Sequence, residues 1–490
     1  MTVPIATVLD AVEAAGVAVR TEVPSGVSVS GVRHDSRNVR PGDLFVAWAG
    51  AAHDGHEFVR AAGDAGAVAA LVEREQEGAP LPQIVVDNAR LAGAVASGLV
   101  AGDLSAEMTT VAITGTNGKT TTAFLARHVL SSRGPAAAVG TLGLVGADGR
   151  RDPTTEGLTT PGFEQITEWL LDLRANGVES VVFEASSHAL AQFRLDALRF
   201  DVMVFTNLTR DHLDYHGDWE GYLDAKRRLV QLSKPDGIVV LNADVPTWIG
   251  MPLTGGRLTY GMDAPADVKA ENLDLSVVGA SFTLTSGGVG APVRIPLLGR
   301  FNVENALAAA SVALAVGMDV DQVAAALNAA PQIPGRLERV TAQPFDVLID
   351  FAHTADALDR VLQTLRPLVD GRLLVVFGAG GDRDRAKRPR MGEAVSRYAD
   401  VAIVTSDNPR TEDPAAIVAE VGAGVTGRAH RVDIVDRREA IRWALEQARP
   451  GDMVLLAGKG HESYQVVGRE KRPFDERAIV LEALGLEGGS

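Results

Sequence analysis

Short runs of aliphatic and β-branched residues alternate with helix-like segments along almost the whole chain. The runs at 181–183, Leu373–Phe377 and 453–456 are apolar at every position, which is typical of strands buried on both faces. Segments such as 355–368 and 437–448 carry apolar residues at a spacing near 3.6 and predict amphipathic helices. The pattern therefore predicts an α/β protein with largely parallel strands.

Two breaks in this pattern divide the 490 residues, a length too great for one hydrophobic core. A polar stretch at 103–107 ends the first series, and Ile333-Pro334-Gly335-Arg336 precedes a new one. We predict an N-terminal domain over 1–106, a central domain over 107–336 and a C-terminal domain over 337–490. The Gly-, Ser- and Thr-rich segment 255–290 alternates apolar and polar residues, so we expect antiparallel strands appended to the central domain.

Composition excludes several classes of function. The chain has no cysteine, so it has neither disulfides nor thiolate metal sites. We read no secretory signal and no apolar run near the roughly 20 residues of a membrane span, and predict a cytoplasmic protein without membrane insertion. A net charge of −16 argues against non-specific nucleic-acid binding, and an anionic substrate would need local basic pockets.

The stretch 111–122, VAITGTNGKTTT, places a glycine-rich loop between an apolar strand and a helix-forming segment. Glycines let backbone N–H groups turn toward an anion, and a helix N-terminus adds partial positive charge. A lysine can then bind the terminal phosphates and a threonine hydroxyl can bind Mg²⁺. A turn whose glycines serve only packing is the alternative, since Ile113 stands where the commonest spacing has glycine. The predicted nucleotide-binding residues are Gly115, Thr116, Asn117, Gly118, Lys119, Thr120 and Thr121.

Polar residues follow the next two predicted strands. Glu184 ends one strand, where it can hold Mg²⁺ directly or through water, or simply cap a helix. The loop after the following strand contains His212, a candidate metal ligand, and His216, which can equally order the turn. Lys226 lies on a predicted helix, where a lysine is usually solvated.

Five motifs stand in one order: GTNGKTT, EASSHAL, FTNLTRDHLDYHG, Ala225-Lys226 and NVENALAA from Asn302. Together they resemble the Mur ligase family, which includes ligases of peptidoglycan precursors and folylpolyglutamate synthetase. The resemblance extends over about 30–476. It implies three α/β domains: a smaller N-terminal domain, a central domain with a P-loop ATPase-type parallel sheet, and a C-terminal Rossmann-like domain.

Within this family, the chain is most similar to the ligases that add the third residue of the stem peptide. The resemblance implies that Ser36 and the loop after Gly50 contact UDP. Leu158 stands where relatives often have Asn, so one side-chain contact of the family is missing. The residues implied to hold the N-acetylmuramoyl-dipeptide are Thr159, Thr160, Ser186, Gln192 and Arg194.

The resemblance also implies ATP and two Mg²⁺ ions. Lys226 matches a family lysine that CO₂ carbamylates, and the carbamate would bind metal beside Glu184 and His212, with Thr120 as a further ligand. Lys119, Glu184, His212 and Lys226 are then the implied catalytic residues. The positions that match contacts to adenine, phosphate and ribose are Asn305, Arg336, Asp350 and His353.

The choice of the third residue is implied to lie in the C-terminal domain. Relatives that add meso-diaminopimelate carry Asp-Asn-Pro-Arg, as at 407–410 here. A guanidinium pairs with a carboxylate in bidentate fashion but would repel the ammonium of lysine. A plain turn is the alternative reading of Asn-Pro. The implied pocket comprises Arg383, Asp407, Asn408, Pro409, Arg410, Gly458 and Glu462.

These implications combine into one predicted activity: a monomeric ATP-dependent ligase that joins UDP-N-acetylmuramoyl-dipeptide to meso-diaminopimelate through an acyl phosphate. A lysine-adding ligase and a folylpolyglutamate synthetase are alternatives within the family. A regulatory protein that binds nucleotide without catalysis is the alternative from another class.

Overall fold

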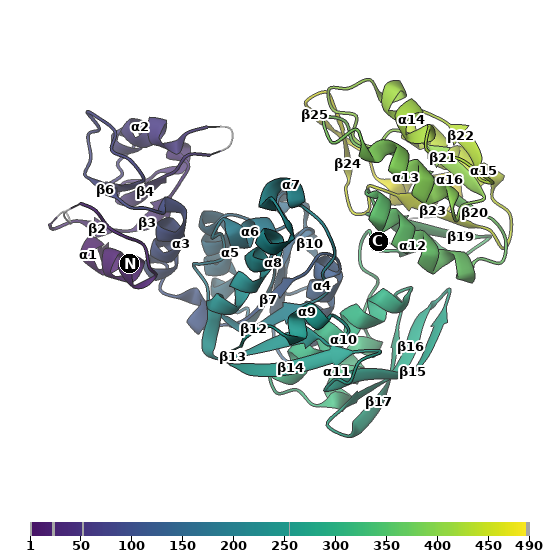
Figure 1. The fold of residues 1–490 in the computed structure, drawn as a ribbon, viewed down its shortest axis with the longest axis horizontal. Helices are drawn as coiled ribbons and strands as arrows, with labels where there is room; N and C mark the ends of the chain where they lie inside the picture. Colours follow the sequence, from purple (N-terminus) through teal and green to yellow (C-terminus); the bar gives the residue numbers. More distant parts are fainter. Residues whose placement is uncertain (1, 22–24, 51–52, 254, 487–490) are drawn as a thin grey trace. The chain divides into compact units, whose positions relative to one another are not determined.

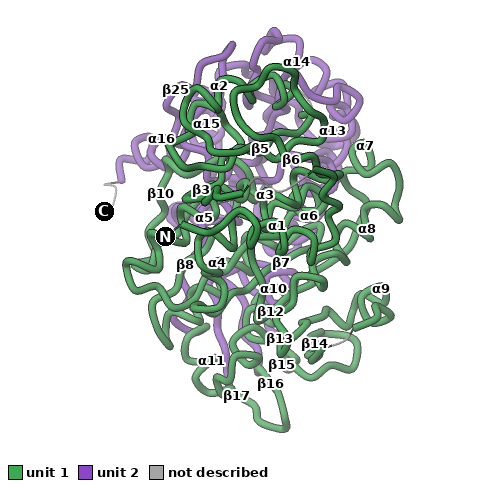
Figure 2. Tube along the Cα trace, turned by 90° about the vertical axis from the view of Figure 1, so that its left-hand side faces the viewer, with its two compact units in different colours: residues 1–271, 284–291, 304–327 green, residues 272–283, 292–303, 328–490 purple. Residues whose placement is uncertain are grey.

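The computed structural model describes residues 2–21, 25–50, 53–253 and 255–486. Backbone contacts divide the chain into two compact units, coloured separately in Figure 2. The first unit comprises Met1–Glu271, Leu284–Ala291 and Glu304–Leu327. The second comprises Asn272–Thr283, Pro292–Val303 and Asn328–Ser490.

The first unit begins with a small parallel sheet in the order β3-β4-β5-β6 (Figure 1). Its helix α1 buries Ile5, Val8, Leu9 and Val12, which lie one helical turn apart on a single face. The bounds are β1 Val3–Pro4, α1 Ile5–Ala14, β2 Ser28–Val29, β3 Gly31–Arg33, β4 Asp43–Ala47, α2 Val59–Asp64, β5 Ala69–Val72, β6 Gln83–Val85 and α3 Ala89–Val100.

The large sheet of the first unit has the strand order β10-β9-β8-β11-β7-β12-β13-β14, followed by the start of β15. Strands β8, β11, β7, β12, β13 and β14 all run parallel. The strand bounds are β7 Thr109–Thr114, β8 Ala136–Gly140, β9 Gly143–Val145, β10 Arg151–Asp152, β11 Ser180–Glu184, β12 Phe200–Phe205, β13 Ser233–Asn242, β14 Gly256–Gly261 and β15 Val268–Ser276. The next strands of the chain are β16 Gly279–Ser286 and β17 Val289–Ile295.

Helices alternate with these strands along the chain, as the 3.6-residue pattern predicted (Figure 1). Helix α4, which follows β7, is buried along most of its length. The helix bounds are α4 Lys119–Leu130, α5 Phe163–Ala175, α6 Ser187–Ala191, α7 Leu213–His216, α8 Trp219–Arg227, α9 Pro246–Ile249, α10 Arg300–Ala315 and α11 Val320–Asn328.

The segment 255–290 differs from the expectation of antiparallel strands at its start. Strand β14 pairs with β15 in parallel, with Tyr260 opposite Val268 and Gly261 opposite Lys269. Apolar-polar alternation reports that a strand is half-buried, but it does not report the direction of its neighbour. The prediction was therefore wrong for this first pair.

The second unit contains a sheet in the order β18-β19-β23-β20-β21-β22. Only β18 is antiparallel to its neighbour, and a separate antiparallel hairpin, β24–β25, lies beyond β23 in the chain. The strand bounds are β18 Glu338–Thr341, β19 Asp346–Asp350, β20 Leu373–Phe377, β21 Val401–Val404, β22 His430–Asp433, β23 Met453–Ala457, β24 Tyr464–Val467 and β25 Glu470–Pro473. The helices are α12 Ala355–Leu365, α13 Lys387–Ser396, α14 Pro414–Gly422, α15 Arg437–Gln447 and α16 Glu476–Ala483.

Burial on both faces explains the uninterrupted apolar runs of this sheet. Val375 and Leu455 pack into one core with residues of α12, α13 and α14, while Leu374 and Leu456 pack into another with residues of α15 and α16. Successive side chains of a strand point to opposite faces, so a sheet covered on both sides needs apolar residues at every position.

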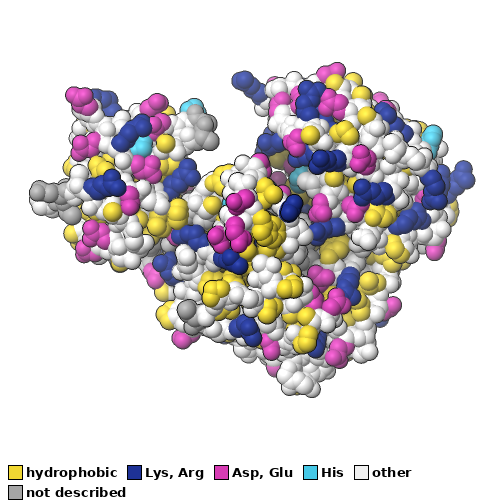
Figure 3. All heavy atoms as spheres, in the orientation of Figure 1, with side chains coloured by type: hydrophobic (Ala, Val, Ile, Leu, Met, Phe, Trp, Pro, Cys, Tyr) yellow, Lys and Arg dark blue, Asp and Glu magenta, His cyan; other side chains and the backbone are white. Residues whose placement is uncertain are grey.

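The predicted α/β class with largely parallel strands agrees with both sheets. Among the described residues, no helix is long and apolar enough to cross a membrane. On the face drawn in Figure 3, Lys and Arg side chains lie among Asp and Glu side chains rather than in one basic patch. The domain boundaries at 106 and 336 stay predictions.

Candidate functional site

The parallel order β8-β11-β7-β12 brings four strand ends to one edge of the large sheet. The first residues beyond these strands are Thr141, Ala185, Gly115 and Thr206. In open α/β sheets, ligands bind outside the carboxyl ends of parallel strands. The predicted phosphate loop therefore lies at the edge where such sheets place their ligands.

At both glycines of the loop, neighbouring side chains leave no room for a Cβ atom. Gly115 has a φ of +151°, and a Cβ there would lie 1.9 Å from Oγ1 of Thr206. Gly118 has a φ of +85°, and a Cβ there would lie 2.3 Å from Oδ1 of Asn305. Gly118 is also the N-cap of α4, and no side chain caps that helix end, which leaves it suited to an anion.

The loop after β12 holds the phosphate loop in place. Asn207 accepts a hydrogen bond from the Asn117 backbone N–H at 2.8 Å, and its own backbone carbonyl accepts one from the Thr116 N–H at 2.9 Å. The hydroxyl of Thr206 donates to the carbonyl of Asn117 at 2.8 Å. Thr206 and Asn207 were not among the predicted site residues, although both belong to the FTNLTRDHLDYHG motif just after the strand end.

Tyr222 of α8 supports the same loop. Its hydroxyl lies 2.9 Å from the hydroxyl of Thr116, which also donates to the carbonyl of Thr209 at 3.0 Å. Burial raises the pKa of Tyr222 to about 12, so its phenol stays protonated at neutral pH.

Two lysine side chains meet on one backbone carbonyl of the loop. Nζ of Lys119 donates to the carbonyls of Gly115 and Thr116 at 3.0 and 2.9 Å, and Nζ of Lys226 donates to the Gly115 carbonyl at 2.8 Å. Lys226 is only 1% exposed. Burial, and then the nearby charge of Lys119, lower the pKa of Lys226 well below its ordinary value. The structure thus places both predicted lysines at the loop and favours a neutral amine on Lys226.

Glu184 ends β11 beside the start of α4. Its Oε2 accepts hydrogen bonds from the hydroxyls of Thr120 at 2.9 Å and Thr141 at 3.1 Å, and its Oε1 accepts one from the Thr141 N–H at 2.7 Å. A Cβ at Gly140 would lie 2.1 Å from Oε1. Glu184 is therefore tied to the phosphate loop rather than capping the following helix, whose N-cap is Ser186. Thr141 was not predicted, because only the sheet order places it here.

His212 lies in a cluster of aromatic side chains. Its ring packs edge-on against His188 with centroids 4.7 Å apart, and His188 also contacts the rings of Tyr215 and His216. Burial, followed by the charges of His212 and His216, lowers the pKa of His188 to about 4, so this ring is neutral at pH 7. No group of three or more His, Cys, Asp or Glu that could hold a metal ion occurs in the described part of the chain.

The residues expected to hold the dipeptide form a connected set. The hydroxyl of Thr160 donates to the Glu184 carbonyl at 2.7 Å and lies 3.2 Å from the hydroxyl of Ser186, while Arg194 donates to the Thr160 carbonyl at 2.8 Å. Arg194 also contacts Gln192, and the hydroxyl of Thr159 lies 3.2 Å from that of Thr141. The large sheet thus brings Thr159, Thr160, Ser186, Gln192 and Arg194 to the strand end of Glu184.

The structure describes only part of the segments predicted to contact UDP. Ser36 opens a short 3₁₀ helix whose N-cap, Asp35, accepts from the N–H of Arg37. Residues 51 and 52 of the loop after Gly50 lie outside the described residues. Leu158 is 59% exposed. The contacts to UDP stay predictions.

In the second unit, Asp350 ends β19 and is buried. Its carboxylate accepts hydrogen bonds from the N–H groups of Leu337 and Ala352, both at 2.8 Å, and burial raises its pKa. The ring of Phe351 contacts the guanidinium of Arg336 and the rings of His353 and His461. Arg336, Asp350 and His353 therefore lie near one strand end, and their predicted contacts to the nucleotide stay predictions. Asn305 lies in the first unit, against Gly118 and Thr122.

The residues predicted to bind the acceptor lie beyond the carboxyl ends of β20, β21 and β23. Nδ2 of Asn408 donates to Oε2 of Glu462 at 3.0 Å, and Gln465 donates to the carbonyl of Asp407 at 2.6 Å. Arg410 has a φ of +50°, a region that few side-chain-bearing residues adopt. It is held there by a hydrogen bond from its N–H to the Val466 carbonyl at 3.1 Å.

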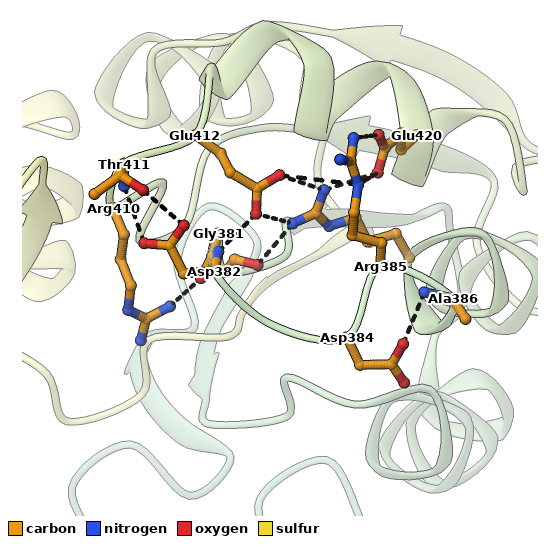
Figure 4. Close-up of polar contacts among 11 residues, drawn as sticks. Gly381, Asp382, Asp384, Arg385, Ala386, Arg410, Thr411, Glu412 and Glu420 are labelled. Atoms are coloured by element: carbon orange, nitrogen blue, oxygen red, sulfur yellow. Dashed lines mark hydrogen bonds and ion pairs between the residues drawn. The ribbon is translucent and has the colours of Figure 1, made fainter. Parts of the chain in front are cut away.

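Figure 4 shows how two loops of this pocket are joined. Arg410 donates to the Gly381 carbonyl at 2.7 Å, and the hydroxyl of Thr411 donates to Asp382 at 2.8 Å. The N–H of Asp382 donates to Glu412 at 2.6 Å, and Glu412 pairs at 2.7 Å with Arg388, whose side chain is 1% exposed. Arg383 is exposed in the same loop, between β20 and α13. Arg388 and Glu412 were not predicted, because their role depends on this loop-to-loop contact.

Three family comparisons match most of the chain. The Mur ligase family catalytic domain matches residues 28–130, the Mur ligase middle domain matches 113–313, and the Mur ligase glutamate ligase domain matches 335–460. The class is therefore clear: the chain belongs to the Mur ligase family. This confirms the predicted family and its three-domain α/β fold.

Individual members of this family are similar to the chain over nearly its whole length. A protein of Geobacter metallireducens named UDP-N-acetylmuramoyl-L-alanyl-D-glutamate–2,6-diaminopimelate ligase is 43% identical, covering 93% of this chain and 94% of that protein. A UDP-N-acetylmuramyl-tripeptide synthetase of Roseiflexus is 41% identical over 94% of this chain and 95% of its own length. A solved structure of a UDP-N-acetylmuramoyl-L-alanyl-D-glutamate–2,6-diaminopimelate ligase is 34% identical to this chain. The match has a TM-score of 0.72 and covers 99% of each chain.

Proposed function

We propose that the chain is an ATP-dependent ligase that joins meso-diaminopimelate to UDP-N-acetylmuramoyl-L-alanyl-D-glutamate, a step of peptidoglycan precursor synthesis. The relatives named for this activity are 40–44% identical over nearly the whole chain. This is also the activity predicted from the sequence. The observation that supports it is that Arg410 and Asn408, which contacts Glu462, lie in one loop after β21, so that a guanidinium and a carboxylate would be available to the distal amino-carboxylate end of the acceptor.

The reaction divides into two steps. A carboxylate oxygen of the dipeptide attacks the γ-phosphorus of ATP, ADP leaves, and an acyl phosphate forms. The amine of diaminopimelate then attacks the acyl carbon, phosphate leaves, and the amine loses a proton. Positioning and charge stabilisation dominate phosphoryl transfer, so the ammonium of Lys119 and the uncapped N-terminus of α4 are suited to the first step.

We propose two Mg²⁺ ions at the phosphate loop, which would neutralise charge on the transferred phosphoryl group. The donor set fits: Thr120 and Glu184 provide oxygens that already lie 2.9 Å apart. At a second site, His212 would act with a carbamate on Lys226. Support for the carbamate comes from the burial of Lys226, because only a neutral amine reacts with CO₂.

The carbamate can be tested by replacing the group it would provide. Lys226→Ala is expected to lose at least about a hundredfold in phosphate release, and added acetate or formate should restore part of it, because a small carboxylate can occupy the vacated space. Lys119→Ala is the matched control, for which no carboxylate should restore activity. Near-normal activity of Lys226→Ala without any additive would rule out the carbamate.

The function is tested by phosphate release from ATP with UDP-N-acetylmuramoyl-dipeptide and one of three additions: meso-diaminopimelate, L-lysine or buffer. We expect release with diaminopimelate and little with the other two, because Arg410 would repel the side-chain ammonium of lysine. Equal release with lysine would favour the lysine-adding alternative. No release with any acceptor would contradict the ligase proposal and favour a regulatory nucleotide-binding protein.

The proposal also includes the oligomeric state, the cellular location and the partners of the protein. We propose that the chain acts as a monomer in the cytoplasm and that its partners are its substrates, without nucleic acid. Turnover with folate and glutamate would instead indicate a folylpolyglutamate synthetase.

A further inference from the structure

A buried lysine lies among the residues of the acceptor pocket. Lys459 follows β23, and its side chain is fully buried. Its Nζ donates to Oδ1 of Asn408 at 3.0 Å and to Oε2 of Glu462 at 3.1 Å, and it lies 3.9 Å from Oδ1 of Asp407. A buried ammonium is costly unless it is paired, so these three contacts define its place in the fold.

Lys459 connects three segments of the second unit. Asn408 and Glu462 lie in the loops after β21 and β23, and Oδ1 of Asn408 also accepts a hydrogen bond from the N–H of Val466 in β24 at 2.8 Å. Since Oδ1 receives the ammonium and this N–H, the amide nitrogen of Asn408 must point to Glu462, to which it donates at 3.0 Å. The contacts form one consistent network.

The network determines which oxygen of Glu462 is presented to an acceptor. Lys459 and Asn408 both contact Oε2. Oε1 is then the oxygen suited to the distal ammonium of the acceptor, while Arg410 is suited to its distal carboxylate. Without Lys459, Oε2 of Glu462 would keep only the hydrogen bond from Asn408, so the carboxylate would be held less firmly in this orientation.

Lys459 also sets the charge of the pocket. Asp407 and Glu462 contribute two negative charges, and Lys459 and Arg410 contribute two positive charges beside that of the exposed Arg383. Groups of both signs suit a distal end that carries both an ammonium and a carboxylate. Removal of the Lys459 charge would make the pocket more negative, which favours a bare ammonium such as the side chain of lysine.

We propose that Lys459 is a positioning residue that sets acceptor specificity: it orients Glu462 and Asn408, and its positive charge beside Asp407 and Glu462 favours a zwitterionic distal end over a bare ammonium. This inference rests on the proposed function, because it concerns the acceptor of that same reaction. It assigns to Lys459 no contact with the acceptor itself.

The test measures steady-state phosphate release by the full chain with ATP and UDP-N-acetylmuramoyl-dipeptide, comparing meso-diaminopimelate with L-lysine. Lys459→Met is expected to raise the KM for diaminopimelate by roughly 10- to 100-fold, the loss expected when a buried charged partner is removed. The KM for ATP should change little. The ratio of kcat/KM for diaminopimelate over lysine should fall by about tenfold or more.

Arg372→Met is the matched control. Arg372 pairs with Asp452 at 2.7 Å and precedes β20, so it lies at the amino-terminal edge of the same sheet, opposite the pocket. The Arg372→Met variant should have a lower melting temperature but an unchanged ratio of kcat/KM for diaminopimelate over lysine. An equal loss of ratio in both variants would show that Lys459 acts only through stability and would overturn the proposal.

Two further variants keep the test decisive if Lys459→Met does not fold. Lys459→Gln retains hydrogen-bond donors without the charge and should also lose the preference, whereas Lys459→Arg retains the charge and should preserve it. An unchanged ratio in Lys459→Gln would overturn the inference. Absence of turnover by the unaltered protein with diaminopimelate would instead contradict the proposed function.

Discussion

At the scale of single residues, Lys226 has an unusual environment. Its ammonium would be buried next to that of Lys119, and both side chains donate to the carbonyl of Gly115. Since Lys119 already satisfies this carbonyl, the fold does not need Lys226 for that hydrogen bond. We therefore attribute the burial of the Lys226 side chain to a chemical role rather than to stabilisation of the fold.

Lys226→Met should therefore stabilise the protein at pH 7 in CO₂-free buffer, by about 1–3 kcal/mol in the free energy of unfolding. The folded pKa of Lys226 lies well below its ordinary value, so only the unfolded chain binds this proton between the folded pKa and about 10.4. Wild-type stability thus rises with pH across that window, and the advantage of the variant should shrink as pH approaches 10.4.

Denaturant unfolding at pH 7 and pH 10 measures this difference. Lys234→Met is the control, because Lys234 pairs with Asp201 at 2.7 Å and its removal should destabilise the protein. A Lys226→Met variant less stable than wild type at pH 7 would show that the buried lysine contributes to the fold.

At the scale of elements, the acceptor pocket depends on close packing between the loop after β20 and the loop after β21. A Cβ at Gly381 would lie 1.9 Å from the carbonyl oxygen of Pro409, directly before Arg410. The two loops also contact each other through Asp382 and Glu412 (Figure 4), and Glu412 pairs with Arg388 at the start of α13. A shift of one loop must therefore move the guanidinium of Arg410.

Gly381→Ala should raise the KM for diaminopimelate by about tenfold or more and lower the melting temperature, since the methyl group cannot fit without moving Pro409. Gly250→Ala is the control: Gly250 has a φ of −80°, and its nearest neighbour to an added Cβ, the Pro246 carbonyl oxygen, is 4.0 Å away. Steady-state kinetics with diaminopimelate and with lysine measure the change in KM, and thermal melts measure the change in melting temperature. An unchanged KM in Gly381→Ala would show that the loops move independently.

At the scale of the whole molecule, both units use the same arrangement. Each contains a parallel sheet, and each collects its candidate residues at the carboxyl ends of neighbouring strands. Glu184 and the phosphate loop meet because β11 pairs with β7, and Asp350 meets the segment of Lys459 because β19 pairs with β23. The strand pairing, rather than the distance along the chain, decides which motifs become neighbours.

The sequence by itself determined the α/β class, the family and the phosphate loop. Those conclusions depend on contiguous patterns: apolar runs, a strand-loop-helix order and motifs in a characteristic sequence. Only the tertiary structure decided the parallel pairing of β14 with β15 and the contacts of Thr141, Asn207 and Lys459. The reason is physical: Lys459 and Asn408 are 51 residues apart, and only the pairing of strands brings their loops together in a buried, charge-paired contact.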